Sequence, residues 1–341
     1  MKLLITGTAG FIGCHLAKKL AGEKHNITCV DNINNYYDTD LKYARLSSLG
    51  FNRCAIEAVG GNKRIDSSVI PGLSFIKTDL CDTQSTASLF CEGAFDIVVH
   101  LAAQAGVRYS LTNPHCYITA NIQGFLNILE AARAYPPRHL VYASSSSVYG
   151  LNDKIPFSED DDVSKPASLY AATKRSNELM AHTYSHLYGI PSTALRFFTV
   201  YGPWGRPDMS PFIFTDAIFK EKPINVFNNG NMKRDFTFID DITEGIIRVM
   251  NRIPGTDSKV PSAIYNIGAG KPVELMDFIH TLEDAIGKKA VINYAPMQPG
   301  DVCATWADCS ALLRDTGFCP QITLSSGIQK YVSWYKEFYA V

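Results

Sequence analysis

The stretch that decides the fold is Leu3-Leu4-Ile5-Thr6-Gly7-Thr8-Ala9-Gly10-Phe11-Ile12-Gly13, near the start of the chain. An apolar run leads directly into three glycines, and a segment with helical periodicity follows. At such a strand-to-helix turn, backbone N–H groups and the helix N-terminus can face a pyrophosphate, and glycines let the phosphates approach the main chain. The spacing is G-x-x-G-x-x-G rather than G-x-G-x-x-G, so the cluster alone could be only a tight turn.

The surrounding pattern makes the glycine turn more informative. Short β-branched runs alternate with helical patterns over the first two hundred residues, which is typical of βαβ units and a parallel sheet. We expect a helix over 11–21, and strands over 2–6, 26–31, 73–77, 96–101, 139–144 and 193–197. The predicted fold class is α/β, with a Rossmann-type doubly wound parallel sheet and a smaller C-terminal lobe.

The domain limits follow from where this alternation stops. Beyond Phe198 the rhythm becomes irregular, with helical patterns only near 240–252 and 275–286. We expect a first domain over 1–198, with 236–266 returning to it, and a lobe over 199–235 and 267–341. Residues 50–72 lack periodicity and predict a surface excursion. The acidic run 159–162 predicts a solvated turn rather than a metal site.

Composition excludes several classes of protein. The formal net charge of −1 over 341 residues provides no electrostatic footprint for nucleic acid. Nine cysteines are an odd number and form no C-x-x-C pair, so we expect reduced, buried thiols of a cytoplasmic protein. No apolar run reaches the ~18 residues that span a bilayer, and the chain begins directly with a strand pattern, so neither a membrane anchor nor a signal peptide is expected.

Asp31 supports a dinucleotide at the glycine turn. It ends the second predicted strand, roughly 20 residues after the glycines, where a carboxylate can accept hydrogen bonds from ribose hydroxyls. The same carboxylate would repel a 2′-phosphate, which favours NAD over NADP. The alternative is an ordinary turn residue at the end of a strand.

Tyr170 and Lys174 are the candidate catalytic pair. They lie four residues apart in an apolar-striped segment that runs toward Tyr188, so on a helix they share a face. An ammonium beside a phenol favours the phenolate, which turns a weak general base into a usable one. Such a pair also occurs by chance in many helices. Here it follows a parallel strand that ends in Ala143-Ser144-Ser145-Ser146-Ser147-Val148-Tyr149-Gly150, whose hydroxyls would emerge at the carboxyl end of the sheet.

Together these residues resemble the extended short-chain dehydrogenase/reductases, the family of nucleotide-sugar epimerases and dehydratases. The match covers essentially the whole chain and includes Asp79-Leu80, His100-Leu101-Ala102-Ala103 and Arg196-Phe197-Phe198. The resemblance implies that the first domain binds NAD through Gly7, Gly10, Phe11, Ile12, Gly13, Asp31, Asn32, Asn35, Asp79, Leu80, Leu101, Ala102, Ala103, Tyr170 and Lys174. It also implies that Ser145 stands at the family's catalytic Ser or Thr position.

The resemblance further implies a reaction. Family members begin by oxidising C4 of the sugar, with Tyr170 as the base here and NAD as hydride acceptor. In the 4,6-dehydratases the serine-run positions resemble Thr-Asp-Glu, and UDP-glucuronate decarboxylases have a Glu at the position of Ser147. This chain has serines at these positions. The remaining outcome is return of the hydride to the other face of the keto sugar, which is 4-epimerisation.

The substrate prediction depends on 196–209, which resembles the signature of UDP-glucuronate 4-epimerases, as does 31–38. A planar guanidinium suits a planar carboxylate, so Arg206 would bind the acid group of UDP-glucuronic acid. The alternative is a surface arginine packed on Trp204. In UDP-glucose 4-epimerases the position of Thr199 is typically Asn. The implied substrate residues are Ser145, Ser146, Ser147, Thr199, Arg206, Arg234 for the pyrophosphate and Asp301 for the uridine ribose.

Three competing interpretations stay open at this point. An epimerase of UDP-glucose or a UDP-N-acetylhexosamine would share every catalytic residue. A non-catalytic NAD sensor would have no use for an activated phenol. An oxidoreductase would release NADH. The family also implies a homodimer formed by the Tyr170 helix and the helix over 122–134.

Overall fold

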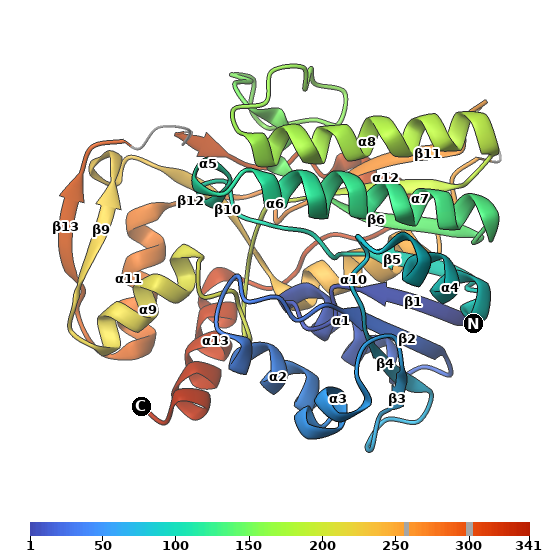
Figure 1. Ribbon diagram of the computed structural model, residues 1–341. Coiled ribbons are helices and arrows are strands. Elements are labelled where there is room, and N and C mark those ends of the chain that lie inside the picture. The colour runs from blue at the N-terminus through green and yellow to red at the C-terminus, as the bar shows by residue number, and fades with distance from the viewer. Residues whose placement is uncertain (256–258, 298–302) are drawn as a thin grey trace. The chain divides into compact units, whose positions relative to one another are not determined.

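The first strand of the chain lies in the middle of an eight-stranded sheet, as the computed structural model of residues 1–255, 259–297 and 303–341 describes it (Figure 1). The strand order is β11 (Ser262–Ile267), β7 (Ser192–Phe197), β6 (His139–Ser145), β5 (Ile97–His100), β1 (Lys2–Thr6), β2 (Asn26–Asp31), β4 (Leu73–Lys77) and β3 (Arg64–Asp66). Strands β1, β2, β4, β5 and β6 pair in parallel. The predicted doubly wound α/β fold is therefore confirmed.

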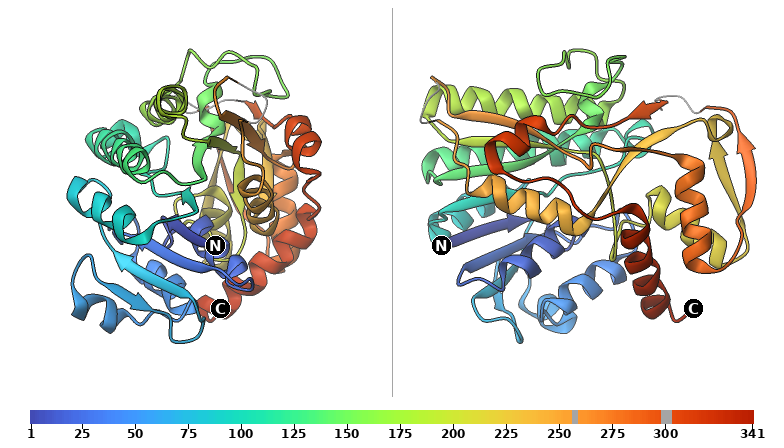
Figure 2. Two further views of the ribbon diagram at one scale, coloured as in Figure 1. Left: turned by 90° about the vertical axis from the view of Figure 1, so that its right-hand side faces the viewer. Right: turned by 180° about the vertical axis from the view of Figure 1, so that it is seen from behind.

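Helices cover both faces of this sheet, which explains why its strands are apolar throughout. On one face lie α4 (Thr83–Gly93), α7 (Gly124–Ala134) and α8 (Leu169–Tyr188), and α1 (Phe11–Leu20) packs on the other (Figures 1 and 2). β5 is buried along its whole length, as expected for a strand between two helical layers. The six predicted strands match the observed ones to within one residue at each end.

The segment 50–72 differs from its prediction. It contains α3 (Arg53–Val59) and β3, which pairs antiparallel to β4 at the sheet edge. Asn52 begins α3 by accepting a hydrogen bond from the amide of Ala55 at 3.2 Å. Both elements are too short for hydrophobic periodicity to reveal, so neither was predicted, although most of the segment is exposed as expected of a surface excursion.

Packing divides the chain into two units. The first contains Met1–Gly150, Val163–Arg196 and Ile246–Tyr265, and the second contains Leu151–Asp162, Phe197–Gly245 and Asn266–Val341. Residues 151–162 and 236–245 thus pack with the second unit, although the predicted domains assign them to the first. Functional domain limits stay a prediction.

The remaining elements complete each unit. The first unit adds α2 (Thr39–Ser48), α5 (Tyr109–Thr112), α6 (His115–Tyr117), a π-helical segment η1 (Ile118–Gln123) and a 3₁₀ turn η2 (Ser146–Tyr149). The second contains β8 (Thr199–Tyr201), α9 (Ser210–Phe219), β9 (Pro223–Phe227), η3 (Asn228–Gly230), β10 (Lys233–Phe238), β12 (Pro272–Glu274), α11 (Leu275–Ile286), β13 (Val291–Ala295), β14 (Ala304–Thr305), α12 (Ser310–Thr316) and α13 (Leu324–Tyr339). Helix α10 (Ile239–Met250) contributes residues to both units. Among the described residues, no helix is both long and apolar enough to cross a lipid bilayer.

The cysteines correct one expectation. All nine are unpaired thiols, but the prediction that they are buried holds fully only for Cys14 and Cys29. Those at 54, 91, 303 and 319 are exposed. An apolar neighbourhood in the sequence does not decide which way a single side chain points from a helix or loop.

The acidic run 159–162 is a turn, but two of its carboxylates are not simply solvated. Asp161, whose side chain is only 5% exposed, accepts hydrogen bonds from the Ser158 amide at 2.9 Å and from Lys154 at 2.6 Å. Glu159 accepts the backbone amide of Asn266 at 2.7 Å. These carboxylates hold loop backbone in place. Across 1–255, 259–297 and 303–341 no cluster of acidic, histidine or cysteine residues could hold a metal ion.

Asp235 on β10 is the main polar anchor of the second unit. Its carboxylate is fully buried and accepts backbone amides from Ala269 at 2.7 Å, Gly270 at 3.0 Å and Ala307 at 3.0 Å. Burial raises the pKa of this carboxyl, and the three amides and the Thr237 hydroxyl oppose that shift. One side chain therefore supports the two segments that follow β11 and β14.

We expect Asp235→Ala to lower the free energy of unfolding by about 3 kcal/mol, because buried amides lose their acceptor. Urea unfolding followed by circular dichroism measures this loss. The control is Glu274→Ala, whose ion pair with Lys233 is half-exposed and should contribute less than about 1 kcal/mol. Equal losses in the two variants would contradict the anchoring role.

Candidate active site

The predicted cofactor residues follow the carboxyl ends of neighbouring parallel strands. Gly7 follows β1, Asn32 follows β2, Asp79 comes two residues after β4, and Leu101 follows β5. Because these strands are parallel and adjacent, their ends meet at one edge of the sheet. The order of strands reverses between β1 and β5, which is where doubly wound sheets bind ligands.

The glycine turn permits a close approach of two backbone segments. A Cβ on Gly7, which has a φ of +76°, would lie 2.8 Å from the nitrogen of Ala102, and a Cβ on Gly13 would lie 2.2 Å from the oxygen of Gly7. Gly10 is the N-cap residue of α1, and among the described residues no side chain caps the first turn of this helix. Phe11 and Ile12 are the first residues of the helix. This turn fits a dinucleotide, because uncapped amides and missing side chains are what a pyrophosphate needs.

Asp31 stabilises the glycine turn through hydrogen bonds to backbone amides. Its carboxylate accepts the amides of Ala9 at 3.0 Å and Ile33 at 2.8 Å. Arg45 of α2 is fully buried and donates to the oxygen of Ala9 at 3.0 Å. Both backbone groups of Ala9, its amide and its oxygen, are therefore hydrogen-bonded to side chains. Burial raises the pKa of the Asp31 carboxyl, and the charge of Lys42 opposes this. A carboxylate has further lone pairs, so the predicted bonds to ribose hydroxyls are compatible with these contacts.

Thr6 is a structural member of the site that the sequence reasoning missed. Its hydroxyl accepts the amides of Leu101 at 3.2 Å and Ala102 at 3.1 Å. It lies 2.9 Å from Nδ1 of His100, and since both lone pairs are used, the hydroxyl donates to that nitrogen. Burial lowers the pKa of His100 to about 3, so the ring is neutral with its proton on Nε2. The signal in the sequence is a hydroxyl at the last position of an apolar strand.

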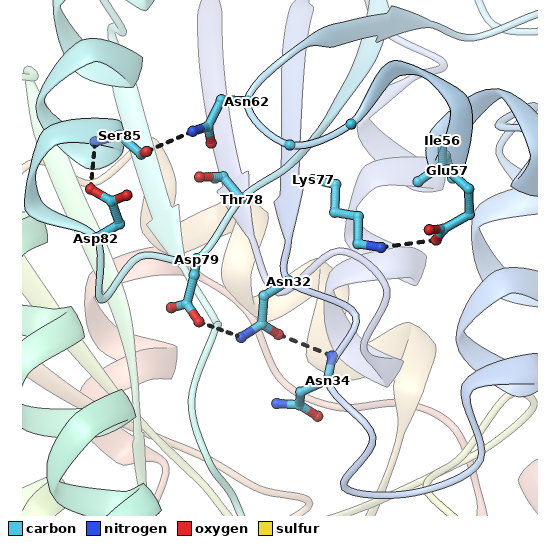
Figure 3. A pocket seen from close by; sticks show the side chains of 12 residues that line it. Asn32, Asn34, Ile56, Glu57, Asn62, Lys77, Thr78, Asp79, Asp82 and Ser85 are labelled. Atoms are coloured by element: carbon cyan, nitrogen blue, oxygen red, sulfur yellow. Dashed lines mark hydrogen bonds and ion pairs between the residues drawn. The ribbon is translucent and has the colours of Figure 1, made fainter.

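A polar hollow of about 490 Å³ opens at the ends of β2 and β4 (Figure 3). Two predicted cofactor residues line it, Asn32 and Asp79, whose side chains hydrogen-bond at 3.3 Å. Lys77 and Glu57 pair at 2.8 Å on its other side. Leu80 is buried and Asn35 is exposed, and neither lines the hollow. The hollow therefore borders one end of the predicted cofactor site only.

Helix α8 carries the predicted catalytic pair. Ser168 caps its start by accepting the amide of Ala171 at 3.1 Å. Lys174 is almost fully buried, and its ammonium donates to the oxygen of Ala143 on β6 at 3.0 Å. Burial lowers the pKa of Lys174 to about 8, and the charge of Glu178 opposes this shift. The ring of Tyr170, one turn earlier, lies 6.1 Å from that of Tyr117.

The serine run begins at the end of β6. Ser145 accepts the amide of Ser147 at 3.2 Å and donates to its hydroxyl at 3.2 Å, so it caps η2. Ser145 is buried, and Ser146 and Ser147 are partly exposed. The hydroxyls of Ser145 and Ser147 thus lie together at the carboxyl end of the strand that Lys174 contacts.

Asn121 is a second residue that the sequence reasoning missed. It lies in η1 and is buried, and its amide group pairs with both the nitrogen and the oxygen of Gln104, at 2.8 and 3.0 Å. It also donates to Thr173 at 3.0 Å, between Tyr170 and Lys174. Asn121 therefore ties the segment after β5 to the catalytic helix. An amide side chain within an otherwise apolar helical stretch was the available signal, but Gln123 and Asn127 share it, and the π-helical segment was not predictable.

The predicted substrate residues of the second unit lie on separate elements. Thr199 is on β8 and Arg234 on β10, which pair in parallel. Arg234 donates to the oxygens of Lys233 at 2.8 Å and Cys303 at 3.2 Å. Asp301 lies outside the described residues.

Arg206 contacts a carboxylate of the chain itself. Its Nε and Nη2 donate to Asp208 at 3.0 and 2.5 Å, the two-point geometry expected for a sugar carboxylate. Trp204 contacts the rings of Trp334 and Phe338, with centroids at 5.3 and 4.8 Å. Sequence reasoning gave no sign of the Asp208 contact.

Comparisons with known proteins show the family to which this chain belongs. A model of the NAD dependent epimerase/dehydratase family matches residues 3–268. A probable UDP-glucuronate 4-epimerase of Rhizobium meliloti (strain 1021) is 44% identical, with 99% of this chain and 98% of that protein covered. UDP-glucuronate 4-epimerase 4 of Arabidopsis thaliana is 42% identical, with 99% and 76% covered. The crystal structure of UDP-glucuronic acid 4-epimerase from Bacillus cereus with UDP-glucuronic acid and NAD is similar with a TM-score of 0.87 at 32% identity, covering 99% of this chain and 100% of that one.

We expect Gly13→Ala to reduce the NAD bound per purified chain by on the order of tenfold, about 1.4 kcal/mol in binding free energy, because the new Cβ displaces the turn. NAD released by denaturation and quantified by chromatography measures this. Gly22→Ala, just beyond the end of the same helix, is the control, since its Cβ would lie 3.6 Å from the nearest atom, the oxygen of Lys19. Full NAD content in Gly13→Ala would contradict the role of this turn.

Proposed function

Because the chain belongs to the NAD-dependent epimerase/dehydratase family, we propose that it converts UDP-glucuronic acid to UDP-galacturonic acid by inverting C4. The observation that carries this proposal is the run Ser145-Ser146-Ser147 at the end of β6, beside Lys174. The run holds hydroxyls and no acid, so the 4-keto sugar has no group there for elimination or decarboxylation. Return of the hydride is the reaction that remains.

NAD is the cofactor of this family, and the chain has a site that fits it. The turn from Gly7 through Gly10, Phe11 and Ile12 to Gly13 is proposed to hold the pyrophosphate. The remaining proposed contacts are made by Asp31, Asn32, Asn35, Asp79, Leu80, Leu101, Ala102, Ala103 and Lys174. When bound, NAD accepts the hydride from C4 and returns it to the opposite face of the sugar.

The proton of the 4-hydroxyl is proposed to be transferred by Tyr170, with Lys174 and Ser145 assisting. Tyr170, as phenolate, takes this proton while C4 is oxidised, and gives it back to the same oxygen when C4 is reduced. Lys174 stabilises the phenolate by its positive charge. Ser145 is proposed to donate a hydrogen bond to the oxygen at C4, so that the sugar is held while its protonation changes.

The sugar carboxylate is proposed to bind Arg206, with Ser146 and Ser147 as hydroxyl donors. Arg206 already binds a carboxylate through two nitrogens in its contact with Asp208, which supports this chemistry. Thr199 is proposed to border the sugar, Arg234 to bind the pyrophosphate, and Asp301 to contact the uridine ribose. A held carboxylate also discourages loss of CO2 from the keto intermediate.

We also propose a homodimer and a cytoplasmic location. Exposed apolar side chains on η1 and α8 support the dimer: Ile118 is 47%, Leu179 53% and Leu187 60% exposed. Nine unpaired thiols, several of them exposed, favour a reducing compartment.

One observation favours a second candidate, the 4-epimerase of a neutral UDP-hexose or UDP-N-acetylhexosamine. Asp208 already occupies the Nε/Nη2 edge of Arg206. If this pair persists with substrate, Arg206 has less positive charge to offer a carboxylate.

Incubation with UDP-glucuronic acid, UDP-glucose and UDP-N-acetylglucosamine, each assigned by proton NMR, tests the proposal. We expect inversion of C4 in UDP-glucuronic acid only. Arg206→Gln should reduce kcat/KM for this substrate by about 10- to 100-fold, because a charge-assisted bond contributes about 1.5–3 kcal/mol.

Arg314→Gln is the matched control. Arg314 pairs with the nearby Asp315 in the same unit and is largely exposed, so its loss should leave kcat/KM unchanged. Turnover of a neutral sugar with equal effects of both substitutions would remove the carboxylate role of Arg206.

A further inference from the structure

Helix α8 carries a third polar side chain on the face that holds the proposed catalytic pair. Glu178 lies one turn beyond Lys174 and two beyond Tyr170, and residues four apart share a helix face. Its side chain is only 1% exposed. A buried carboxylate is costly unless it is paired and hydrogen-bonded. The proposed chemistry assigns Glu178 no role, so its environment requires an explanation.

Two strands and the helix itself supply partners for this carboxylate. Arg196 on β7 donates from Nε and from Nη2, both at 2.9 Å. Ser144 on β6 donates at 2.6 Å, and Arg175 donates at 2.9 Å. Burial raises the pKa of the Glu178 carboxyl, but these donors outweigh burial and the net shift is downward. Glu178 is therefore ionised at neutral pH.

The Glu178–Arg196 pair holds both ends of the serine run. Ser144, which bonds Glu178 directly, immediately precedes Ser145. Tyr149, which ends η2, receives a hydrogen bond from Nη1 of Arg196 at 3.0 Å, and the guanidinium carbon lies 4.9 Å from the centre of its ring. The three hydroxyls of the run thus lie between two points that one buried ion pair fixes.

Lys174 is held at the adjacent residue of the same strand. Its ammonium donates a hydrogen bond to the oxygen of Ala143, and Glu178 accepts one from Ser144. Helix α8 therefore contacts two consecutive residues of β6. Two hydrogen bonds at successive residues restrict movement of the helix along the strand. We propose that Glu178, acting through Arg196 and Ser144, is a positioning residue that sets Ser145 relative to Lys174 and Tyr170.

Glu178 also acts on Lys174 through its charge. The titratable groups that interact with this ammonium are Glu178 on the same helix and His100 on β5, and Glu178 itself is surrounded by Arg175 on α8, Tyr142 on β6 and Arg196 on β7. His100 is neutral, because burial lowers its pKa to about 3. Glu178 is the anion among them and opposes the lowering of the Lys174 pKa by burial. Removal of its charge should make Lys174 lose its proton at lower pH.

The inference rests on the proposed function for the roles of Tyr170, Lys174 and Ser145. Ser144→Ala is the primary test, because it removes one link between β6 and Glu178 and leaves the ion pair intact. We expect kcat to fall on the order of tenfold, less than the ~100-fold that a 1 Å misplacement can cost. The KM for the sugar and the NAD content should be unchanged.

Arg175→Gln is the matched control. Arg175 bonds the same carboxylate at 2.9 Å but contacts it from α8 itself, so its loss frees neither strand. We expect kcat within about twofold of the unchanged protein. An equal loss in Ser144→Ala and Arg175→Gln, with both proteins folded, would overturn the positioning role, as would an unchanged kcat in Ser144→Ala.

Glu178→Gln tests the charge. We expect the alkaline limb of the kcat profile to move down by about one pH unit, because Lys174 loses an opposing anion. A purely structural role would lower kcat without moving this limb. The losses in kcat of Ser144→Ala and Glu178→Gln should not be additive in the double variant, since both residues belong to one contact between α8 and β6. If Glu178→Gln does not fold, Ser144→Ala and Arg175→Gln still decide the question.

A second readout separates this inference from the proposed function. The phenolate absorbance of Tyr170 is obtained as the difference between each NAD-loaded protein and its Tyr170→Phe variant during a pH titration. We expect the phenolate to form at lower pH in Glu178→Gln, because loss of a nearby negative charge favours the anionic form of the phenol. If the unchanged protein binds NAD but converts no UDP-sugar, the proposed function fails, and an unshifted phenolate titration would then separately reject the inference.

Discussion

The close approach of two backbone segments at the sheet edge is the constraint on which the rest of the site depends. The turn after β1 passes so near the segment after β5 that a Cβ on Gly7 would lie 2.8 Å from the nitrogen of Ala102. Thr6 holds the second segment, and Asp31 and Arg45 hold the first. With these contacts, the segments after β1 and β5 are fixed at the point where the strand order reverses, which is where doubly wound sheets bind ligands. Helix α8, which carries the proposed catalytic pair, is attached to η1 by the hydrogen bond from Asn121 to Thr173 and to β6 by the one from Lys174 to Ala143.

Much of this arrangement was predictable from the chain. The apolar runs of β1 and β2 predict their observed limits because these strands are largely buried and end at Gly7 and Asp31. The i, i+4 spacing of Tyr170 and Lys174 likewise predicts one helix face. What was missed depends on tertiary contacts. α3 and β3 are too short to show a period, and the burial of Asp161 depends on a loop that folds back on itself.

The polar residues that support the site were the hardest to predict. Thr6 and Asn121 are buried and contact backbone groups of distant segments, and Glu178 is buried against side chains of two strands, so neighbours in the sequence say little about their partners. Arg206 shows the same limit, because its charge predicts a carboxylate partner, and the structure supplies Asp208. In the proposed function these parts have different roles: the glycine turn and α8 are proposed to define the shared chemistry, and the side chains at the end of β6 to select the outcome.

The central claim is that C4 is oxidised and then reduced within one turnover, with Tyr170 moving the proton. The most direct measurement uses UDP-glucuronic acid that carries deuterium at C4, with the label in the product followed by NMR. We expect the galacto product to retain the deuterium at C4 and no free NADH to accumulate. Loss of the label to solvent, or release of labelled NADH, would contradict this claim, because C4 would then be inverted by another route or oxidised without return.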